Sequence, residues 1–93
     1  MERRAHLVFK GRVQGVFFRA NAQRIAKELG LRGWVRNCLD GSVEAVVEGP
    51  QPQVRSLIER LRREVNAARV DAVEENWEAA TGEFAAFDVR PDS

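Results

Sequence analysis

The stretch that decides the fold is Gly11–Arg19, which reads GRVQGVFFR. The apolar run His6–Phe9 precedes it and predicts a strand, while Ala20–Leu29 follows it and predicts a helix. A turn from a strand into a helix directs several backbone N–H groups, and the positive end of the helix dipole, at one point. The stretch is therefore typical of an anion site, and phosphate is the anion that suits it best.

Two residues of this stretch strengthen that interpretation. Gly15 can adopt a positive φ, which helps successive backbone amides converge on one anion. Arg19 places a cation in the first turn of the helix, where the dipole disfavours it by about 0.3–1 kcal/mol. A bound anion would offset this repulsion, as is typical of functional sites that break a local rule. The residues alone leave a second interpretation open, namely a surface arginine beside an ordinary loop.

Length and composition set limits on the protein class. The 93 residues predict one domain spanning 1–93, which buries about 60–70% of its unfolded surface and so needs no covalent cross-links. The single cysteine, Cys38, excludes an intrachain disulfide framework and favours the cytoplasm. One histidine and one cysteine exclude a Cys/His zinc site. The absence of an 18-residue apolar run and the net charge of +1 argue against membrane and nucleic-acid partners.

Periodicity and turn residues predict the first half of the chain. His6–Val13 is expected to form a strand and Ala20–Leu29 a helix with one apolar stripe. Leu31–Asn37 and Ser42–Glu48 are expected to be the second and third strands, and the third shows the alternation of a half-buried strand. A hairpin joins them, and its strongest turn signal is Asp40-Gly41.

The second half continues with a helix and two more strands. Gly49–Pro52 ends the third strand and begins a helix, because proline is tolerated in a first turn. Val70–Trp77 is expected to be a strand, Ala79–Glu83 a loop, and Phe84–Arg90 a short last strand. The order β-α-β-β-α-β plus a short strand predicts an α+β, ferredoxin-like split β-α-β sandwich, with two helices on one face of an antiparallel sheet.

This topology predicts a juxtaposition of two distant segments. The first two strands run parallel with the third between them, so their carboxyl ends share one edge of the sheet. The loop Gln14–Arg19 then faces Asn37 across two strand spacings, which is about 10 Å. A phosphoryl group and one water fit in that space.

Two motifs at the right separation resemble the signatures of the acylphosphatase family. Gly11–Arg19 resembles its first signature, and Gly33–Asn37 (GWVRN), followed by Gly41, Val43 and Gly49, resembles its second. The Gly49-Pro50 helix opening and the closing pair Phe84 and Phe87 also fit, so the resemblance covers nearly the whole chain.

The resemblance implies hydrolysis of acyl phosphates to a carboxylate and inorganic phosphate. Arg19 matches the family's phosphate-binding arginine and Asn37 its water-orienting asparagine. The amides that would cradle the phosphate are those of Gln14, Gly15, Val16, Phe17 and Phe18. The family needs no metal or organic cofactor, and we expect a monomer with a small-molecule substrate.

The residues present suit this chemistry independently. Phosphoryl transfer asks the protein mainly for positioning and charge stabilisation. A carboxylate, whose conjugate acid has a pKa of about 4, leaves without a general acid, so the lack of a histidine at the site is no obstacle. The amide of Asn37 can accept from a water and donate to a phosphoryl oxygen, although it cannot take a proton.

Five other residues have simpler interpretations. Cys38 as a nucleophile lacks any activating partner that the sequence can place, so a packing role is expected. Asp40 is explained by its turn, and His6 lies at a strand start away from the site. Trp34 and Phe17 could stack on the acyl group, but packing is the more frequent fate of an aromatic residue.

Two other functions remain to be weighed. The same fold serves RNA-binding and metabolite-sensing modules, but the RNA-binding version needs aromatic and basic residues on its central strands. The third strand presents Glu44 and Glu48 instead. The other alternative is the acylphosphatase-like domain of a carbamoyl-transferring maturation factor, for whose partner domains 93 residues leave no room.

Overall fold

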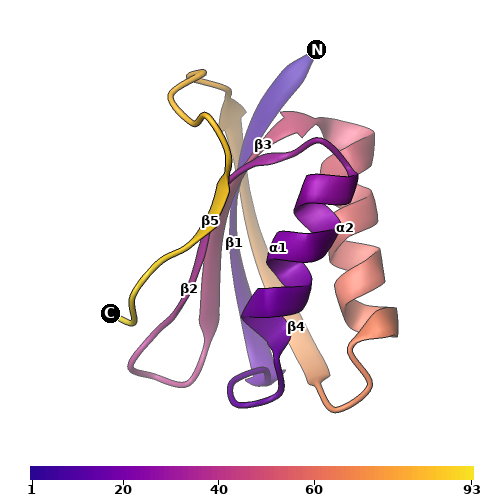
Figure 1. The fold of residues 1–93 in the computed structure, drawn as a ribbon, viewed down its shortest axis with the longest axis vertical. Helices are drawn as coiled ribbons and strands as arrows, with labels where there is room; N and C mark the ends of the chain where they lie inside the picture. The colour runs from indigo at the N-terminus through magenta and orange to yellow at the C-terminus, as the bar shows by residue number, and fades with distance from the viewer.

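The computed structural model describes all of residues 1–93 and contains five strands and two helices. Both helices lie on one face of a single sheet whose strand order is β4-β1-β3-β2-β5 (Figure 1). The elements in chain order are β1 (Glu2–Arg12), α1 (Phe18–Glu28), β2 (Arg32–Asn37), β3 (Val43–Pro50), α2 (Gln51–Glu64), β4 (Arg69–Ala79) and β5 (Phe87–Val89). This is the predicted ferredoxin-like arrangement. Neither helix is both long and apolar enough to cross a membrane.

The sheet is not wholly antiparallel, which corrects the prediction. β1 pairs antiparallel with β3 and β4, and β2 antiparallel with β3, but β5 runs parallel to β2. β5 is also only three residues long, whereas a strand was expected over Phe84–Arg90. Residues 80–86 before it form a loop, in which the backbone N–H groups of Thr81 and Gly82 donate to the carboxylate of Glu48.

The core lies between the sheet and the two helices. Alternate residues of β1 and β3 face the helices, and each helix buries one stripe against them. Burying each large apolar side chain contributes about 1.5–3 kcal/mol. The bulkiest members of this core are Leu7, Phe9, Phe18, Ile25, Leu57, Leu61 and Phe87, all at most 1% exposed.

Glu48 is the one charged side chain that is fully buried, and it lies on the β3 face opposite the helices. Its Oε2 accepts from the Thr81 N–H at 2.9 Å and from the Thr81 hydroxyl at 3.1 Å, and its Oε1 accepts from the Gly82 N–H at 3.0 Å. Burial raises the pKa of this carboxyl, but the hydrogen bonds outweigh burial, so its pKa lies below the ordinary value.

The topology brings two connections and the carboxyl-terminal residues to one end of the molecule. The β1–α1 loop and the β2–β3 hairpin lie together at the lower end in Figure 1, with the carboxyl-terminal residues beside the hairpin. Backbone hydrogen bonds secure this arrangement, because the Leu39 N–H donates to the Ser93 carbonyl at 2.9 Å and the Ser93 N–H to the Asn37 carbonyl at 3.1 Å. The predicted meeting of residues 14–19 with Asn37 therefore occurs at this end.

Candidate active site

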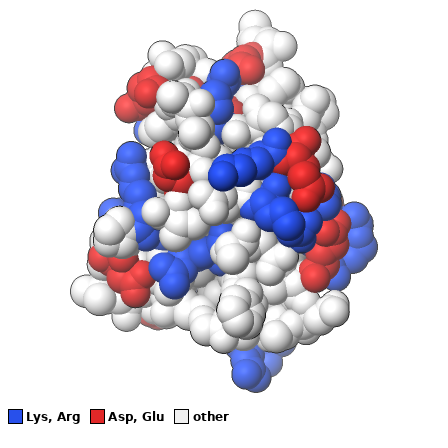
Figure 2. Space-filling model, viewed as in Figure 1, with Lys and Arg blue, Asp and Glu red and all other residues white.

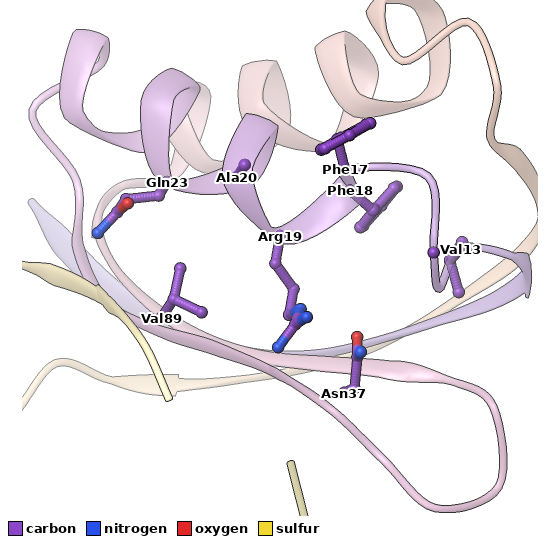
Figure 3. A pocket seen from close by; sticks show the side chains of 9 residues that line it. Val13, Phe17, Phe18, Arg19, Ala20, Gln23, Asn37 and Val89 are labelled. Atoms are coloured by element: carbon purple, nitrogen blue, oxygen red, sulfur yellow. The ribbon is translucent and has the colours of Figure 1, made fainter. Parts of the chain in front are cut away.

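A cavity of about 410 Å³ opens where the β1–α1 loop, the start of α1 and the carboxyl ends of β2 and β5 meet (Figure 3). Its polar lining residues include Arg19 and Asn37, which come from different elements and whose side chains both point into the same space. The full lining is Val13, Gly15, Phe17, Phe18, Arg19, Ala20, Gln23, Asn37 and Val89. The structure thus unites the two side chains that the sequence singled out.

The loop between β1 and α1 has two residues with a positive φ, as is typical of a tight turn. Gly15 has a φ of 72°, which confirms the positive φ expected there, and Phe17 has a φ of 61°. Phe17 is the only residue other than glycine with a positive φ, a conformation that costs about 1–3 kcal/mol and is concentrated at functional sites. The Asn21 N–H and Nδ2 both donate to the Phe17 carbonyl, at 3.1 and 2.9 Å, and hold this turn at the helix start.

The predicted amide donors fall into two groups. Gly15, Phe17 and Phe18 line the cavity, whereas Gln14 and Val16 do not. The side chain of Phe18 belongs to the core, where its ring packs edge-to-face on Phe9 with centroids 5.1 Å apart. The role of these amides in binding phosphate remains a prediction.

Arg19 and Asn37 differ in how their polar groups are satisfied. The Arg19 side chain is 36% exposed, and its Nη1 donates to Asp92 Oδ1 at 3.1 Å. Asn37 is 8% exposed, and its Oδ1 is buried without any hydrogen-bond partner. A buried acceptor left unpaired costs about 1–3 kcal/mol, so Asn37 has a carbonyl oxygen ready to accept from a ligand or a water.

The side chain of Gln14 has a role that the sequence did not reveal. Its Nε2 donates to the carbonyls of Cys38 and Ser42, both at 2.8 Å, and so joins the β1–α1 loop to the β2–β3 hairpin. The family resemblance implies only a backbone role for Gln14. The available signal was a long amide side chain opposite a hairpin turn, where free carbonyls are common.

Four lining residues were also missed, and one of them, Val13, directly follows β1. Ala20 and Gln23 belong to α1, and Gln23 lies one turn after Arg19, so helical spacing could have placed it beside the cavity. The Gln23 Nε2 donates to the Phe87 carbonyl at 3.1 Å and fixes α1 to β5. Val89 comes from β5, whose pairing had no sequence signal.

Trp34 and Phe17, the two aromatic residues considered for stacking on the substrate, lie in different environments. Trp34 is 9% exposed on the sheet face opposite the helices, where the guanidinium carbons of Arg36 and Arg90 lie 4.9 and 4.7 Å from its ring centre. Its packing role is confirmed. The same expectation was wrong for Phe17, which is 81% exposed at the cavity, because its positive φ turns the side chain outward.

The remaining discounted residues lie outside this cavity. Asp40 Oδ1 accepts from the Ser42 hydroxyl at 2.6 Å and the Ser42 N–H at 2.9 Å, which confirms its turn role and lowers its pKa. His6 Nε2 lies 2.6 Å from Glu44 Oε2 on the other sheet face. The side chains form no cluster of three or more His, Cys, Asp or Glu residues with the geometry of a metal site.

Charges on the surface do not gather by sign. Figure 2 shows Lys and Arg side chains interspersed with Asp and Glu over the visible face. Glu44 on β3 is engaged by Arg36, whose Nε donates to Glu44 Oε1 at 2.8 Å. A basic platform of the kind that binds nucleic acid is therefore not seen on this face or at Glu44.

Comparison with known proteins places this chain in a family. The family model for acylphosphatase matches residues 5–89. The chain belongs to the acylphosphatase family. An acylphosphatase from Pyrobaculum islandicum is 52% identical over 89 residues, which are 95% of this chain and 94% of the relative.

Solved structures agree with this membership. A crystal structure of acylphosphatase from Bacillus subtilis has a TM-score of 0.89 and 30% identity, and the match covers 95% of this chain and 98% of that one. HypF from T. kodakarensis is similar to all of this chain with a TM-score of 0.79 and 35% identity, but the match covers only 12% of HypF. The fold therefore occurs both in acylphosphatases of about this length and within a longer protein.

Proposed function

We propose that this protein hydrolyses the carboxyl–phosphate anhydride bond of acyl phosphates. A water oriented by Asn37 attacks phosphorus directly, while Arg19 and the amides of residues 14–18 hold the phosphoryl group. Membership of the acylphosphatase family supports the reaction. The observation that carries the assigned roles is the buried Asn37 Oδ1 without a partner, in the same cavity as the Arg19 guanidinium.

Arg19 supplies positive charge to a group whose negative charge is spread over three oxygens in the transition state. Its guanidinium offers two parallel N–H donors, which match the spacing of two phosphoryl oxygens. The backbone amides of the turn add neutral donors, and the start of α1 adds the positive end of a helix dipole. The backbone amides and the start of α1 are fixed before substrate arrives, so they cost little reorganisation during the reaction.

Asn37 orients the nucleophile. Its Oδ1 accepts a hydrogen bond from the water, and its Nδ2 donates to a phosphoryl oxygen, so one amide spans both reacting groups. The water oxygen forms a bond to phosphorus as the bond from phosphorus to the acyl oxygen breaks. The carboxylate leaves with that electron pair, and a phosphoryl oxygen takes the proton that the water loses.

The leaving group explains why this site needs no general acid. A carboxylate is a weak base whose conjugate acid has a pKa of about 4, so it departs as an anion at neutral pH. The only titratable side chain lining the cavity is Arg19. Catalysis is thus assigned to positioning and charge stabilisation alone.

Release of phosphate from benzoyl phosphate tests the proposal. We expect turnover with the purified protein, undiminished by a chelator such as EDTA, and competitive inhibition by inorganic phosphate. No release of phosphate would contradict the proposed function. Loss of turnover with chelator, restored by adding a divalent metal, would contradict the mechanism and leave the reaction class standing.

We also infer a monomer in the cytoplasm. The support for this is one free cysteine with no disulfide and only four exposed large apolar side chains, two of which line the cavity. Light scattering after gel filtration should give a mass close to 10.5 kDa. A mass twice this value would contradict the monomer.

A further inference from the structure

The turn into α1 presents a run of backbone N–H groups that have no partner in the protein. Those of Gly15, Val16 and Phe17 donate to no backbone or side-chain acceptor. The next three, of residues 18–20, precede the first hydrogen bond of the helix, which joins the Asn21 N–H to the Phe17 carbonyl at 3.1 Å. The start of α1 also has no side-chain cap and no acidic residue in its first turn. These donors are therefore available to an anion.

The conformation of Phe17 determines where these N–H groups point. Phe17 directly precedes α1 with a φ of 61° and a ψ of 25°, in the left-handed region that bulky residues rarely adopt. A return to a negative φ would relieve this strain and rotate the adjoining peptide groups. The direction of the N–H groups thus depends on a contact that holds Phe17 in place.

Asn21 supplies that contact from one helical turn further on. Its side-chain Nδ2 donates to the Phe17 carbonyl at 2.9 Å, in addition to its backbone N–H, so both lone pairs of the oxygen are used. The backbone bond is one that any residue except proline could form, whereas the side-chain bond depends on this residue type. Asn21 Oδ1 accepts from Arg24 Nη2 at 2.9 Å, so each end of the amide has a partner of the right kind.

Holding the Phe17 carbonyl also fixes the Phe18 N–H. The two belong to one planar trans peptide group, in which the C=O and N–H bonds point in opposite directions. The carbonyl points along the helix toward Asn21, so the Phe18 N–H points out of the amino-terminal end of α1. Phe17, Phe18 and Arg19 at this end all line the cavity (Figure 3).

We propose that Asn21 is a positioning residue for phosphate binding. Its Nδ2 holds the peptide group between Phe17 and Phe18 in the orientation that directs the Phe18 N–H at the phosphoryl group. Asn21 is not among the residues that line the cavity, so it acts through this peptide group and does not touch the substrate. The inference rests on the proposed function and extends the phosphate site to a residue outside the cavity.

Asn21→Ala and Asn21→Ser test the side-chain bond. Alanine removes the donor, whereas a serine hydroxyl in a helix can donate to the carbonyl four residues earlier. We expect Asn21→Ala to raise the inhibition constant of inorganic phosphate, and the KM for benzoyl phosphate, about two- to tenfold, as for the loss of one neutral hydrogen bond. Asn21→Ser should restore most of the lost affinity.

Thermal unfolding of the same variants separates positioning from stability. Alanine is a better helix former than asparagine, and relaxation of Phe17 would relieve strain, so the thermal midpoint of Asn21→Ala should not fall in step with its affinity for phosphate. Serine and asparagine have similar helix propensities. A difference in phosphate affinity between Asn21→Ala and Asn21→Ser therefore reports the hydrogen bond to the Phe17 carbonyl.

The Phe18 N–H gives a direct readout of the proposed effect. Phosphate added to the 15N-labelled protein should shift the amide resonance of Phe18, because a new hydrogen bond forms there. In Asn21→Ala the shift at saturating phosphate should be smaller, and in Asn21→Ser it should return. An equal shift in all three proteins would show that Asn21 does not direct this N–H.

Two variants serve as matched controls. Asn66→Ala makes the same substitution at an exposed residue in the turn between α2 and β4. Arg24→Ala removes the partner of Asn21 Oδ1 and leaves both hydrogen bonds to the Phe17 carbonyl. Both variants should keep the inhibition constant of inorganic phosphate.

The outcomes distinguish this inference from the proposed function. An unchanged inhibition constant in Asn21→Ala would overturn the positioning role, as would a raised constant that Asn21→Ser does not lower. The hydrolysis of acyl phosphates would stand in either case. Failure of the unaltered protein to hydrolyse benzoyl phosphate or to bind inorganic phosphate would instead contradict the proposed function.

Discussion

The guanidinium of Arg19 donates to the carboxylate of Asp92 at 3.1 Å, across 73 positions of sequence. The cation assigned to the phosphoryl group is thus paired with an acid from residues that follow β5. Hydrogen bonds of Ser93 with Leu39 and Asn37 hold these residues against the hairpin. The pair occupies one donor of the guanidinium, so the proposed mechanism implies that Asp92 and phosphate compete for Arg19.

Removing this competitor should strengthen phosphate binding. We expect Asp92→Asn to lower both the KM for benzoyl phosphate and the inhibition constant of inorganic phosphate. An exposed ion pair contributes about 0.2–1 kcal/mol, which corresponds to a factor of roughly 1.5 to 5. Asp88→Asn is the control, because Asp88 is exposed on β5, forms no ion pair, and changes the net charge equally. An unchanged or raised inhibition constant in Asp92→Asn would show that the Asp92 carboxylate and phosphate do not compete for Arg19.

Arg19 should be needed for both binding and turnover. Arg19→Ala is expected to raise KM and lower kcat, because charged contacts to phosphate exist in the ground state and strengthen in the transition state. The decrease in kcat should be about 10²–10³, the usual effect of removing one preorganised donor. Arg24→Ala, an exposed arginine of the same helix that pairs with Glu28, controls for lost charge. Steady-state kinetics that leave kcat intact would contradict the role of Arg19.

Asn37→Ala should separate binding from catalysis. We expect kcat to fall by about 10²–10³ while the inhibition constant of inorganic phosphate rises by a much smaller factor, since the variant loses one neutral donor but keeps Arg19 and the backbone amides. The variant also removes a buried oxygen that has no partner, so its thermal midpoint should not fall. Near-normal kcat would refute the water-orienting role, and a large loss of phosphate binding would assign Asn37 to the phosphate cradle instead.

Much of the fold was predictable because its signals are local. Alternation in β3, the helical stripe of α1 and the Asp40-Gly41 turn each specify their element within a few residues. The pairing of β5 with β2 was not predictable, since it depends on contacts such as the Gly33 N–H with the Ala86 carbonyl, far apart in sequence. Residues 14–19 and Asn37 were found because topology places strand ends together.

What escaped prediction at the site was the direction of side chains. The sequence predicted that Phe17 packs in the core, but its φ of 61° directs the side chain outward. The amide of Gln14 could have pointed anywhere, and the hairpin carbonyls that it reaches are 24 and 28 positions away. Asp92 follows the last strand in a segment without any periodic pattern. Each of these contacts depends on tertiary geometry that no local pattern encodes.

Gln14 is expected to act as a positioning residue. Gln14→Leu, similar in size, removes the two hydrogen bonds that join the β1–α1 loop to the hairpin after Asn37. The carbonyls of Cys38 and Ser42 keep partners in the N–H groups of Gly41 and Cys38, so stability should fall by only about 1–2 kcal/mol.

The kinetic effect of Gln14→Leu should be larger than its effect on stability. A misplacement of about 1 Å between reacting groups can lower the rate about 10²-fold, so we expect a reduced kcat with a smaller change in KM. Urea unfolding and steady-state kinetics on the same preparation measure both. A variant that loses stability and keeps kcat would show that the Gln14 hydrogen bonds stabilise the fold and do not position the reacting groups.

The ionisation of Glu48 should make the free energy of unfolding depend on pH. Its folded-state pKa is lowered, so its contribution is fully present above the pKa of the unfolded chain and is lost as pH falls through the folded-state pKa. Glu48→Gln replaces one acceptor oxygen by a donor that faces the N–H of Thr81 or Gly82. The variant should lose about 1–3 kcal/mol of unfolding free energy at pH 7.

The difference between the two proteins should shrink as the solution is acidified. Once the Glu48 carboxyl is protonated, the unaltered protein loses the same charged acceptor that the variant lacks, and their unfolding free energies converge. Other carboxyls with lowered pKa values, such as Glu44 and Glu28, titrate in both proteins and cancel in the comparison. Urea unfolding from pH 7 to pH 3 measures this difference, and a gap that stays constant with pH would show that the Glu48 carboxylate is not the charge that holds the loop of residues 80–86 on β3.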